Sequence, residues 1–231
     1  MKRRFAFLLA LWLVFCGGAH AAANVSPAAL ATVPLLLQKE YDEPITIKSG
    51  ARKSVSSSGC GAVCLSMAAS YLSPRIEQTP VSVFQWAVDH ELYQGNGLQP
   101  DSMSALAASL NMDCRWVDGK TPSGLLAVTA ALEKGFPVIG RMGAGTFTRR
   151  GHYILLRGFD SDGKVMVNDP ASEERSQVSY DLSMIARQTR EEQSFLILTT
   201  TIIYPGDSFL ASGRQEVQAA DNETAEIDAG S

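Results

Sequence analysis

A run of small residues at positions 56–59 (Ser-Ser-Ser-Gly) brings one cysteine, Cys60, to the start of an apolar stretch. The stretch has helical periodicity from Gly61 to Leu72 and stops before proline, so we expect a helix there. A thiol at a helix N-terminus lies at the positive end of the peptide dipoles, which favours thiolate over thiol. The segment therefore predicts a reactive cysteine. The alternative is a buried structural thiol, against which the polar approach argues.

The first 21 residues have the form of an export signal. A basic start at residues 2–4 precedes an apolar core at residues 5–15, and Ala19-His20-Ala21 supplies the small residues of a cleavage site. Cys16 raises the alternative of a lipidated, anchored protein, but the preceding Phe15 is not the small residue that such a signal needs. We therefore expect cleavage after Ala21 and a periplasmic or secreted protein.

Composition narrows the classes of function. A net charge of -4 argues against nucleic acid as a partner, because nucleic-acid binding needs a basic face. No segment after the signal has the length and apolar character of a stable membrane span. We expect a linker over residues 22–32, one domain over residues 33–204 and a disordered tail over residues 205–231. The sequence indicates no cofactor and leaves the oligomeric state unknown.

Three cysteines follow the signal, and they allow either one free thiol and one disulfide or three unpaired thiols. Cys60 and Cys64 are four residues apart, so on a helix their Cβ atoms lie about 5–6 Å apart. A disulfide needs a Cβ separation of about 3.5–4.5 Å. We therefore expect Cys64 in the core, and a bridge between Cys64 and Cys114 stays open as an alternative.

The pattern of elements indicates an α+β fold, with helices first and antiparallel strands second. The expected helices cover residues 61–72, 81–92, 103–110 (capped by Asp101 or Ser102) and 122–134. The expected strands cover residues 33–38, 113–117, 137–141, 153–159, 164–168 and 195–204, and residues 39–58 are expected to form an irregular loop.

A nucleophilic cysteine needs a proton acceptor, and only two histidines follow the signal. His90 lies between Asp89 and Glu91 on a polar helix stretch, which is typical of a solvated side chain. His152 opens a predicted hairpin, and it is the candidate base. Two histidines so far apart in the sequence also argue against a structural zinc site.

The acidic partner of His152 follows from the parity of this hairpin. If residues 161 and 162 form a two-residue loop, Ile154 lies opposite Asp169, and His152 then projects from the same face as Asp169. A single bulge would shift the register and present Asn168 instead, and an asparagine can also orient an imidazole.

Four segments, in order, resemble the C39-like, papain-type cysteine peptidases. They are residues 33–38 (Val-Pro-Leu-Leu-Leu-Gln), residues 58–67 around Cys60, residues 132–139 (Leu-Glu-Lys-Gly-Phe-Pro-Val-Ile), and Gly151-His152-Tyr153 with the later Gly158-Phe159-Asp160 and Asn168-Asp169-Pro170. The resemblance implies a papain-like fold, a helical half packed against an antiparallel sheet. It also implies Cys60 as nucleophile, His152 as base, Asp169 as its orienter and Gln38 as an oxyanion donor.

The chain departs from the family where Ala62-Val63-Cys64 replaces the usual Pro-Thr-Ser after the nucleophile's glycine. A proline at a helix start preorganises the backbone, and that contribution is lost here. We expect a cysteine peptidase that acts on a peptide or protein substrate. The alternatives are a papain-like amidase acting on peptidoglycan peptides and a peptide-binding module without catalysis.

Overall fold

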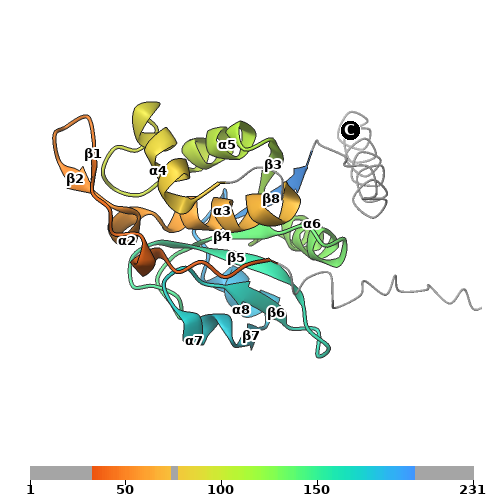
Figure 1. Ribbon diagram of the computed structural model, residues 1–231. Coiled ribbons are helices and arrows are strands. Elements are labelled where there is room, and N and C mark those ends of the chain that lie inside the picture. The colour runs from red at the N-terminus through yellow and green to blue at the C-terminus, as the bar shows by residue number, and fades with distance from the viewer. Residues whose placement is uncertain (1–32, 74–77, 201–231) are drawn as a thin grey trace, which may run out of the picture.

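A layer of helices packs on a six-stranded antiparallel sheet in the computed structural model, which describes residues 33–73 and 78–200 (Figure 1). The expected signal, linker and tail lie outside the described residues, as do residues 201–204 of the last expected strand. Within the described ranges, no helix combines the length and apolar character needed to cross a membrane.

The sequence predicts helices first and strands second, whereas some helices lie between the strands of the main sheet along the chain. The helices are η1 (Gln38–Glu40), α2 (Val55–Ser58), α3 (Cys60–Leu72), α4 (Pro80–Asp89), α5 (Pro100–Ser109), α6 (Pro122–Glu133), α7 (Glu173–Ser176) and α8 (Leu182–Arg187). The strands are β1 (Ile45–Thr46), β2 (Arg52–Lys53), β3 (Met112–Val117), β4 (Val138–Met142), β5 (His152–Phe159), β6 (Val165–Asn168), β7 (Ser179–Tyr180) and β8 (Phe195–Thr200). The helices between the strands of the main sheet are α6, α7 and α8.

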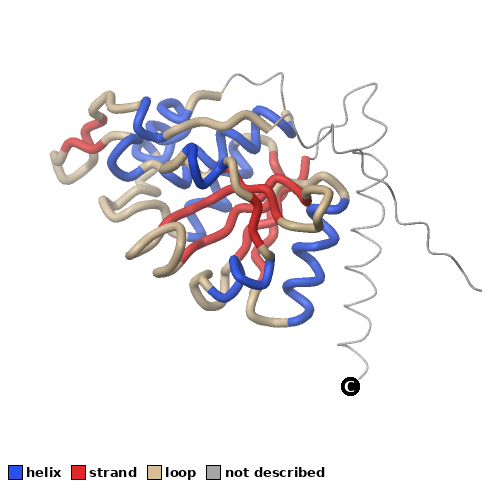
Figure 2. Tube along the Cα trace, turned by 90° about the horizontal axis from the view of Figure 1, so that it is seen from below, coloured by secondary structure: helices blue, strands red, loops and turns tan. Residues whose placement is uncertain are grey.

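The main sheet has the order β3-β8-β4-β5-β6-β7, and every neighbouring pair is antiparallel. Helices α3, α4 and α5 lie above the sheet in Figure 1, and α7 lies at its lower edge. Figure 2, turned by 90°, shows the strands in the middle with helices around them. This arrangement confirms the predicted α+β fold, with a helical half packed against an antiparallel sheet.

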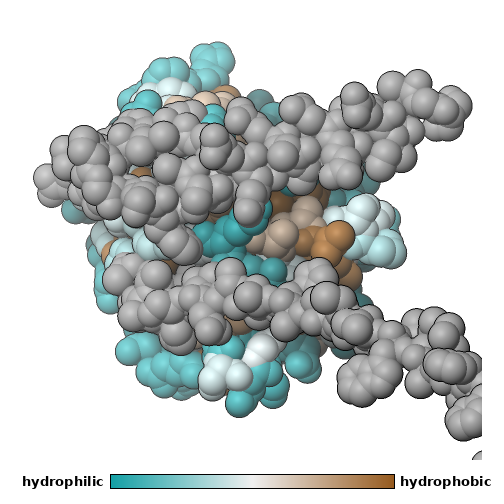
Figure 3. Space-filling view, turned by 90° about the vertical axis from the view of Figure 1, so that its right-hand side faces the viewer, coloured by the Kyte–Doolittle hydropathy of each residue, from teal (hydrophilic) through white to brown (hydrophobic). Residues whose placement is uncertain are grey.

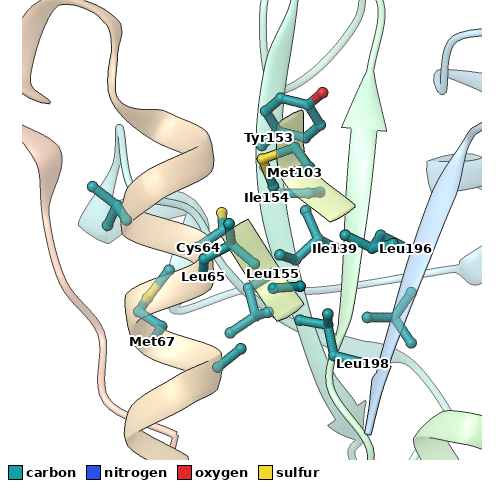
Figure 4. Packing of buried hydrophobic residues seen from close by; sticks show 14 of the residues in the cluster. Cys64, Leu65, Met67, Met103, Ile139, Tyr153, Ile154, Leu155, Leu196 and Leu198 are labelled. Atoms are coloured by element: carbon teal, nitrogen blue, oxygen red, sulfur yellow. The ribbon is translucent and has the colours of Figure 1, made fainter. Parts of the chain in front are cut away.

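Helix α3 is the centre of the core. Residues 61–69 are all buried, because the helix carries mainly small and aliphatic side chains on every side, as is typical of a helix enclosed by protein. Cys64 and Leu65 point from α3 toward Ile154 and Leu155 of β5 (Figure 4). The core therefore fixes α3 against the strand that begins with His152.

Two sequence predictions in the N-terminal half are wrong. Residues 33–37 form no strand, and Gln38 lies in η1. The side-chain amide of Asn168 donates to the carbonyls of Val33 (3.2 Å) and Pro34 (3.0 Å), so a side chain rather than a neighbouring strand satisfies this backbone. Residues 39–58 are not irregular throughout, because they contain the β1–β2 hairpin and α2.

Helix α5 begins earlier than expected. Its N-cap is Gln99 and its first residue is Pro100, so neither Asp101 nor Ser102 caps it. Proline at the first helical position is favourable because the missing N–H has no acceptor there in any case.

The β5–β6 hairpin is confirmed, but its loop is one residue longer than predicted and β5 contains a bulge. Phe159 pairs with Val165, and the amide of Asp160 donates to the carbonyl of Lys164 (2.8 Å), which leaves a three-residue loop. A register shift between Leu156 and Gly158 then offsets the odd loop, and Leu155 pairs with Asn168. The loop and the bulge cancel, so the register near His152 is the one the two-residue loop predicted.

Few large apolar side chains are highly exposed among the described residues. Figure 3 shows the face at the right of Figure 1, where a hydrophobic area lies beside hydrophilic side chains. Among the described residues, the exposed large apolar side chains are Leu126 on α6 (70 % exposed) and Val178 (52 %). Val178 lies in the connection between α7 and β7, on a different segment from Leu126.

Candidate active site

Cys60 is the first residue of α3, and the short helix α2 and Gly59 directly precede it. Helix α2 ends at Ser58, and Gly59 is both its C-cap and the N-cap of α3. A Cβ added to Gly59 would lie 2.6 Å from the Cα of Val55, so only glycine fits between the two helices. The small residues of the sequence motif therefore permit the sharp α2–α3 junction that presents the thiol.

Gly61 lets the start of α3 approach β5. A Cβ at this position would lie 2.7 Å from the sulfur of Met103 and 3.2 Å from the ring of Tyr153. Figure 4 shows Met103 and Tyr153 side by side near this end of the core. The close approach matters because Tyr153 follows His152 in β5, so it brings the nucleophile's helix to the strand of the candidate base.

His152 lies between Cys60 and Asp169. Its Nε2 is 2.7 Å from Oδ1 of Asp169, and its side chain is only 8 % exposed. The ring also interacts with Cys60, and this interaction lowers the pKa of the thiol. Because Nε2 is engaged by the carboxylate, Nδ1 is the ring nitrogen left to face the sulfur. The structure thus brings together three residues that are far apart in the sequence.

Asp169, rather than Asn168, contacts the imidazole. The side-chain amide of Asn168 instead donates to the carbonyls of Val33 and Pro34. The two adjacent residues therefore divide their roles: one orients the histidine and the other anchors the segment that carries Gln38.

The carboxylate of Asp169 is fully buried, and three donors satisfy it. Besides His152, the amide of Ala171 donates to Oδ1 (2.8 Å) and Nε of Arg175 donates to Oδ2 (2.6 Å). The Oγ of Ser176 accepts from the amide of Asp169 (2.8 Å). A buried charge needs such partners, because leaving it unpaired would cost several kcal/mol.

Sequence reasoning missed Arg175 and Ser176. Both lie on α7, one turn of helix that Ser172 caps through its side chain. The available signal was the spacing Asp169-Pro170 followed by Ser172 and two glutamates, which resembles a helix start. Nothing in the sequence indicated that this turn folds back onto the carboxylate.

The electrostatics of the three groups favour a charged pair. Burial opposes ionisation of Cys60, but the hydrogen bond with His152 and the attraction of its positive charge outweigh burial, so the pKa of Cys60 lies below its usual value of 9.0. Burial also disfavours a charged His152, but its hydrogen bonds with Asp169 and Cys60 raise the pKa to about 9. These opposite shifts favour a thiolate and an imidazolium together near neutral pH.

The pKa of Asp169 is lowered, which keeps the carboxylate charged. Burial alone would raise it, whereas the hydrogen bond and charge of His152, followed by Arg175, hold the pKa below its usual 3.8. The carboxylate is therefore ionised throughout the range in which the cysteine and histidine would act.

Gln38 is brought to the same region by backbone contacts. Its amide N–H donates to the carbonyl of Pro170 (2.8 Å), next to Asp169, and its side-chain Nε2 donates to the carbonyl of Ser56 (3.1 Å) on α2. One N–H of the side-chain amide is thus engaged, and the second can serve another acceptor. The buried Oε1 of Gln38 has no hydrogen-bond partner.

The three cysteines of the described residues are all free thiols, so Cys64 and Cys114 form no bridge. Cys64 is fully buried on α3, as expected, and burial followed by the nearby Cys60 and Asp169 raises its pKa well above 9.0. Cys114 is half-buried on β3, and burial raises its pKa as well. Cys60 is therefore the one described cysteine whose surroundings favour the thiolate. Within the described ranges, no three metal-binding side chains gather into a site.

The fold is that of papain-like cysteine peptidases, and one solved structure supports this at the level of the fold. A protein from Bacillus anthracis assigned as a C39-like peptidase superposes with a TM-score of 0.51 at 14 % identity, covering 75 % of this chain and 98 % of that chain. The peptidase domain of Streptococcus ComA, a bifunctional ABC transporter involved in quorum sensing, gives 0.45 at 15 % identity, covering 62 % and 92 %. A double glycine motif protease from an AMS/PCAT transporter, in complex with the leader peptide, gives 0.42 at 16 %, covering 73 % and 99 %.

The family follows from the sequence match. The model of the Peptidase_C39 like family matches residues 31–200, most of the chain. A comparison with proteins of curated function finds no match. The chain belongs to the Peptidase_C39 like family, as the four segments of the sequence predicted.

Proposed function

We propose that this chain is an exported cysteine peptidase that hydrolyses peptide bonds through Cys60, His152 and Asp169. The observation that carries the proposal is that the His152 ring is hydrogen-bonded to the buried Asp169 carboxylate (2.7 Å) and lowers the pKa of the Cys60 thiol. Nucleophile, base and orienting group within hydrogen-bond reach are what covalent acyl transfer requires.

In the proposed reaction, the Cys60 thiolate attacks the carbonyl carbon of the scissile peptide bond. The imidazolium of His152 then donates its Nδ1 proton to the leaving amine as the C–N bond breaks, which leaves a thioester on Cys60. His152, now neutral, takes a proton from water, and the resulting hydroxide attacks the thioester and releases the acid. Asp169 keeps Nε2 protonated throughout, so the same ring nitrogen always faces the sulfur.

The negative oxygen of the tetrahedral intermediate needs donors. The backbone N–H of Cys60 is one candidate, because the first N–H groups of a helix have no acceptor within it. The second N–H of the Gln38 side-chain amide is the other, since its first is held by Ser56. Donors that are fixed before the reaction stabilise the developing charge without reorganisation.

The proposal is tested by comparing the peptides that the chain and its Cys60→Ala variant release from a mixture of unstructured proteins, read by mass spectrometry. We expect products that depend on Cys60. A parallel incubation with purified peptidoglycan separates a peptidase from the amidase alternative by which substrate is cut. If neither substrate yields a product that depends on Cys60, the chain is not a hydrolase of this kind.

Alkylation tests the noncatalytic alternative without any substrate. Iodoacetamide should modify Cys60 near neutral pH much faster than Cys114, because only Cys60 has a lowered pKa. Equal and slow modification of both would support a peptide-binding module on this fold. Export is tested separately, by locating the chain with and without residues 1–21 in fractionated cells and determining the N-terminus of the product.

A further inference from the structure

Four arginines lie on segments that meet at the start of β5, next to the candidate active site. Arg141 lies on β4 and pairs in register with Tyr153, the residue after His152. Arg149 and Arg150 directly precede Gly151 and His152 in the chain. Arg190 reaches the same place from the segment after α8, because its amide donates to the carbonyl of Arg141 (2.9 Å). We refer to these four residues as the arginine cluster.

The cluster is held in place by its surroundings. The Nη2 of Arg190 donates to the carbonyl of Arg150 (3.0 Å), and a Cβ on Gly151 would lie 3.0 Å from that same nitrogen. The segment before Arg149 is tied to the segment before Arg190, since the side chain of Gln188 accepts from the amide of Thr146 (2.6 Å). These cations therefore sit on a defined surface rather than on free chain ends.

The charge of the cluster is not neutralised within the described part of the chain. No carboxylate there forms an ion pair with any of the four guanidinium groups. The nearest acidic residues in sequence are Glu191 and Glu192, and Glu191 lies toward Lys120 instead, with Oε1 3.9 Å from Nζ. Four neighbouring cations in a chain with a net charge of -4 make a local field opposite in sign to that of the whole protein.

Tyr153 links the cluster to the nucleophile. Its ring packs against Gly61, the residue after Cys60, and its backbone N–H helps to lower the pKa of the Cys60 thiol. The phenol O–H donates to the carbonyl of Leu98 (3.0 Å). Burial raises the pKa of the phenol, and the charges of Arg141 and Arg190 oppose this shift. Tyr153 thus contacts the helix start that carries Cys60 and also pairs with Arg141, so one residue connects the nucleophile to the cluster.

We propose that the arginine cluster binds acidic side chains of the substrate next to the scissile bond, so that the enzyme selects peptides rich in aspartate and glutamate. The inference rests on the proposed peptidase function and adds its substrate class. Guanidinium groups suit this role because their planar fork matches a carboxylate, and they stay charged at every relevant pH. An extended peptide rises only about 3.3 Å per residue, so we expect the acidic positions close to the cut in the sequence.

Binding is measured first, on the full chain carrying Cys60→Ala, by fluorescence anisotropy. The probes are rhodamine-labelled Gly/Ser peptides of one length that carry glutamates, glutamines or lysines at the same positions. We expect the glutamate peptide to bind at least about tenfold more tightly than the glutamine peptide at low salt, and the difference to shrink as the ionic strength rises from about 0.05 M to about 0.5 M. Equal affinity for the glutamate and glutamine peptides would overturn the inference.

Two sets of variants assign the effect to the cluster. Arg150→Gln with Arg190→Gln should weaken binding of the glutamate peptide by about 5- to 20-fold, since an exposed ion pair contributes a factor of about two to five. Arg52→Gln, on the exposed hairpin strand β2, is the matched control and should change nothing. Replacing Arg150 and Arg190 with glutamate should reverse the preference toward the lysine peptide. An equal loss in the control would refute the assignment.

A cleavage experiment tests the acidic preference separately from the proposed peptidase activity. Sites cut by the wild type but not by Cys60→Ala are collected from a proteome-derived peptide mixture. Enrichment of Asp and Glu near those sites, lost in the Arg150→Gln/Arg190→Gln variant, supports both proposals. Cleavage that depends on Cys60 without such enrichment leaves the peptidase standing and removes the acidic preference. Glutamate-peptide binding that depends on the arginines, without cleavage of any peptide, removes the peptidase and leaves an acidic-peptide site.

Discussion

The substitution Asp169→Asn tests whether the buried carboxylate controls the reactivity of Cys60 through His152. The carboxylate stabilises the imidazolium, and the imidazolium stabilises the thiolate. The pKa of His152 is about 9, compared with an ordinary value of 6.5. That difference corresponds to about 3 kcal/mol in favour of the charged ring, shared between Asp169 and Cys60.

The expected magnitude follows from this free energy. If Asp169 supplies half of it, its loss shifts the balance between the charged and neutral pair by a factor of about ten. A thiol restored to its ordinary pKa of 9.0 would be about 1 % ionised at pH 7, which sets the upper limit at about 100-fold. We therefore expect Asp169→Asn to slow alkylation of Cys60 at pH 7 by about 10- to 100-fold.

The assay is the rate of iodoacetamide modification as a function of pH, followed on each cysteine by mass spectrometry. Cys64 is fully buried and reports unfolding, because it reacts only when the core opens. Cys114 is half-buried and serves as an internal standard for the reagent. Asp162→Asn, in the exposed turn between β5 and β6, is the matched control. A rate at Cys60 within twofold of wild type, with Cys64 still protected, would refute the coupling.

Three further predictions concern the same site. The raised pKa of His152 means that its positive charge stabilises the folded chain fully below pH 6.5, and that this stabilisation is lost as the pH rises through about 9. The thermal unfolding midpoints of the wild type and His152→Gln should therefore converge between about pH 7 and pH 10. Gly59→Ala should cost about 1–3 kcal/mol in denaturant unfolding and slow alkylation of Cys60, since the added Cβ meets the backbone of Val55; an unchanged midpoint would contradict the packing argument. Gln38→Ala should reduce kcat for peptide cleavage by about 100- to 1000-fold while leaving alkylation unchanged, and a small effect on kcat would remove Gln38 from the oxyanion site.

Local sequence determined the helix that carries the cysteine. Small residues followed by an apolar run of about three turns can form little else, and the observed α3 begins at Cys60 itself. The turn residues Asp160 to Gly163 likewise determined that two strands pair there. Both are short-range effects, in which backbone preference and side-chain size act on neighbours in the chain.

The environment of each site residue was decided by the tertiary structure. Asp169 faces His152 because a three-residue loop and the bulge between Leu156 and Gly158 cancel, and the turn motif alone did not reveal this combination. Gln38 lies in η1 rather than on a strand, because Asn168 and Pro170 bind the backbone of its segment across more than 130 residues. Contacts between distant segments depend on how the whole core closes, and a single sequence specifies them only through the complete fold.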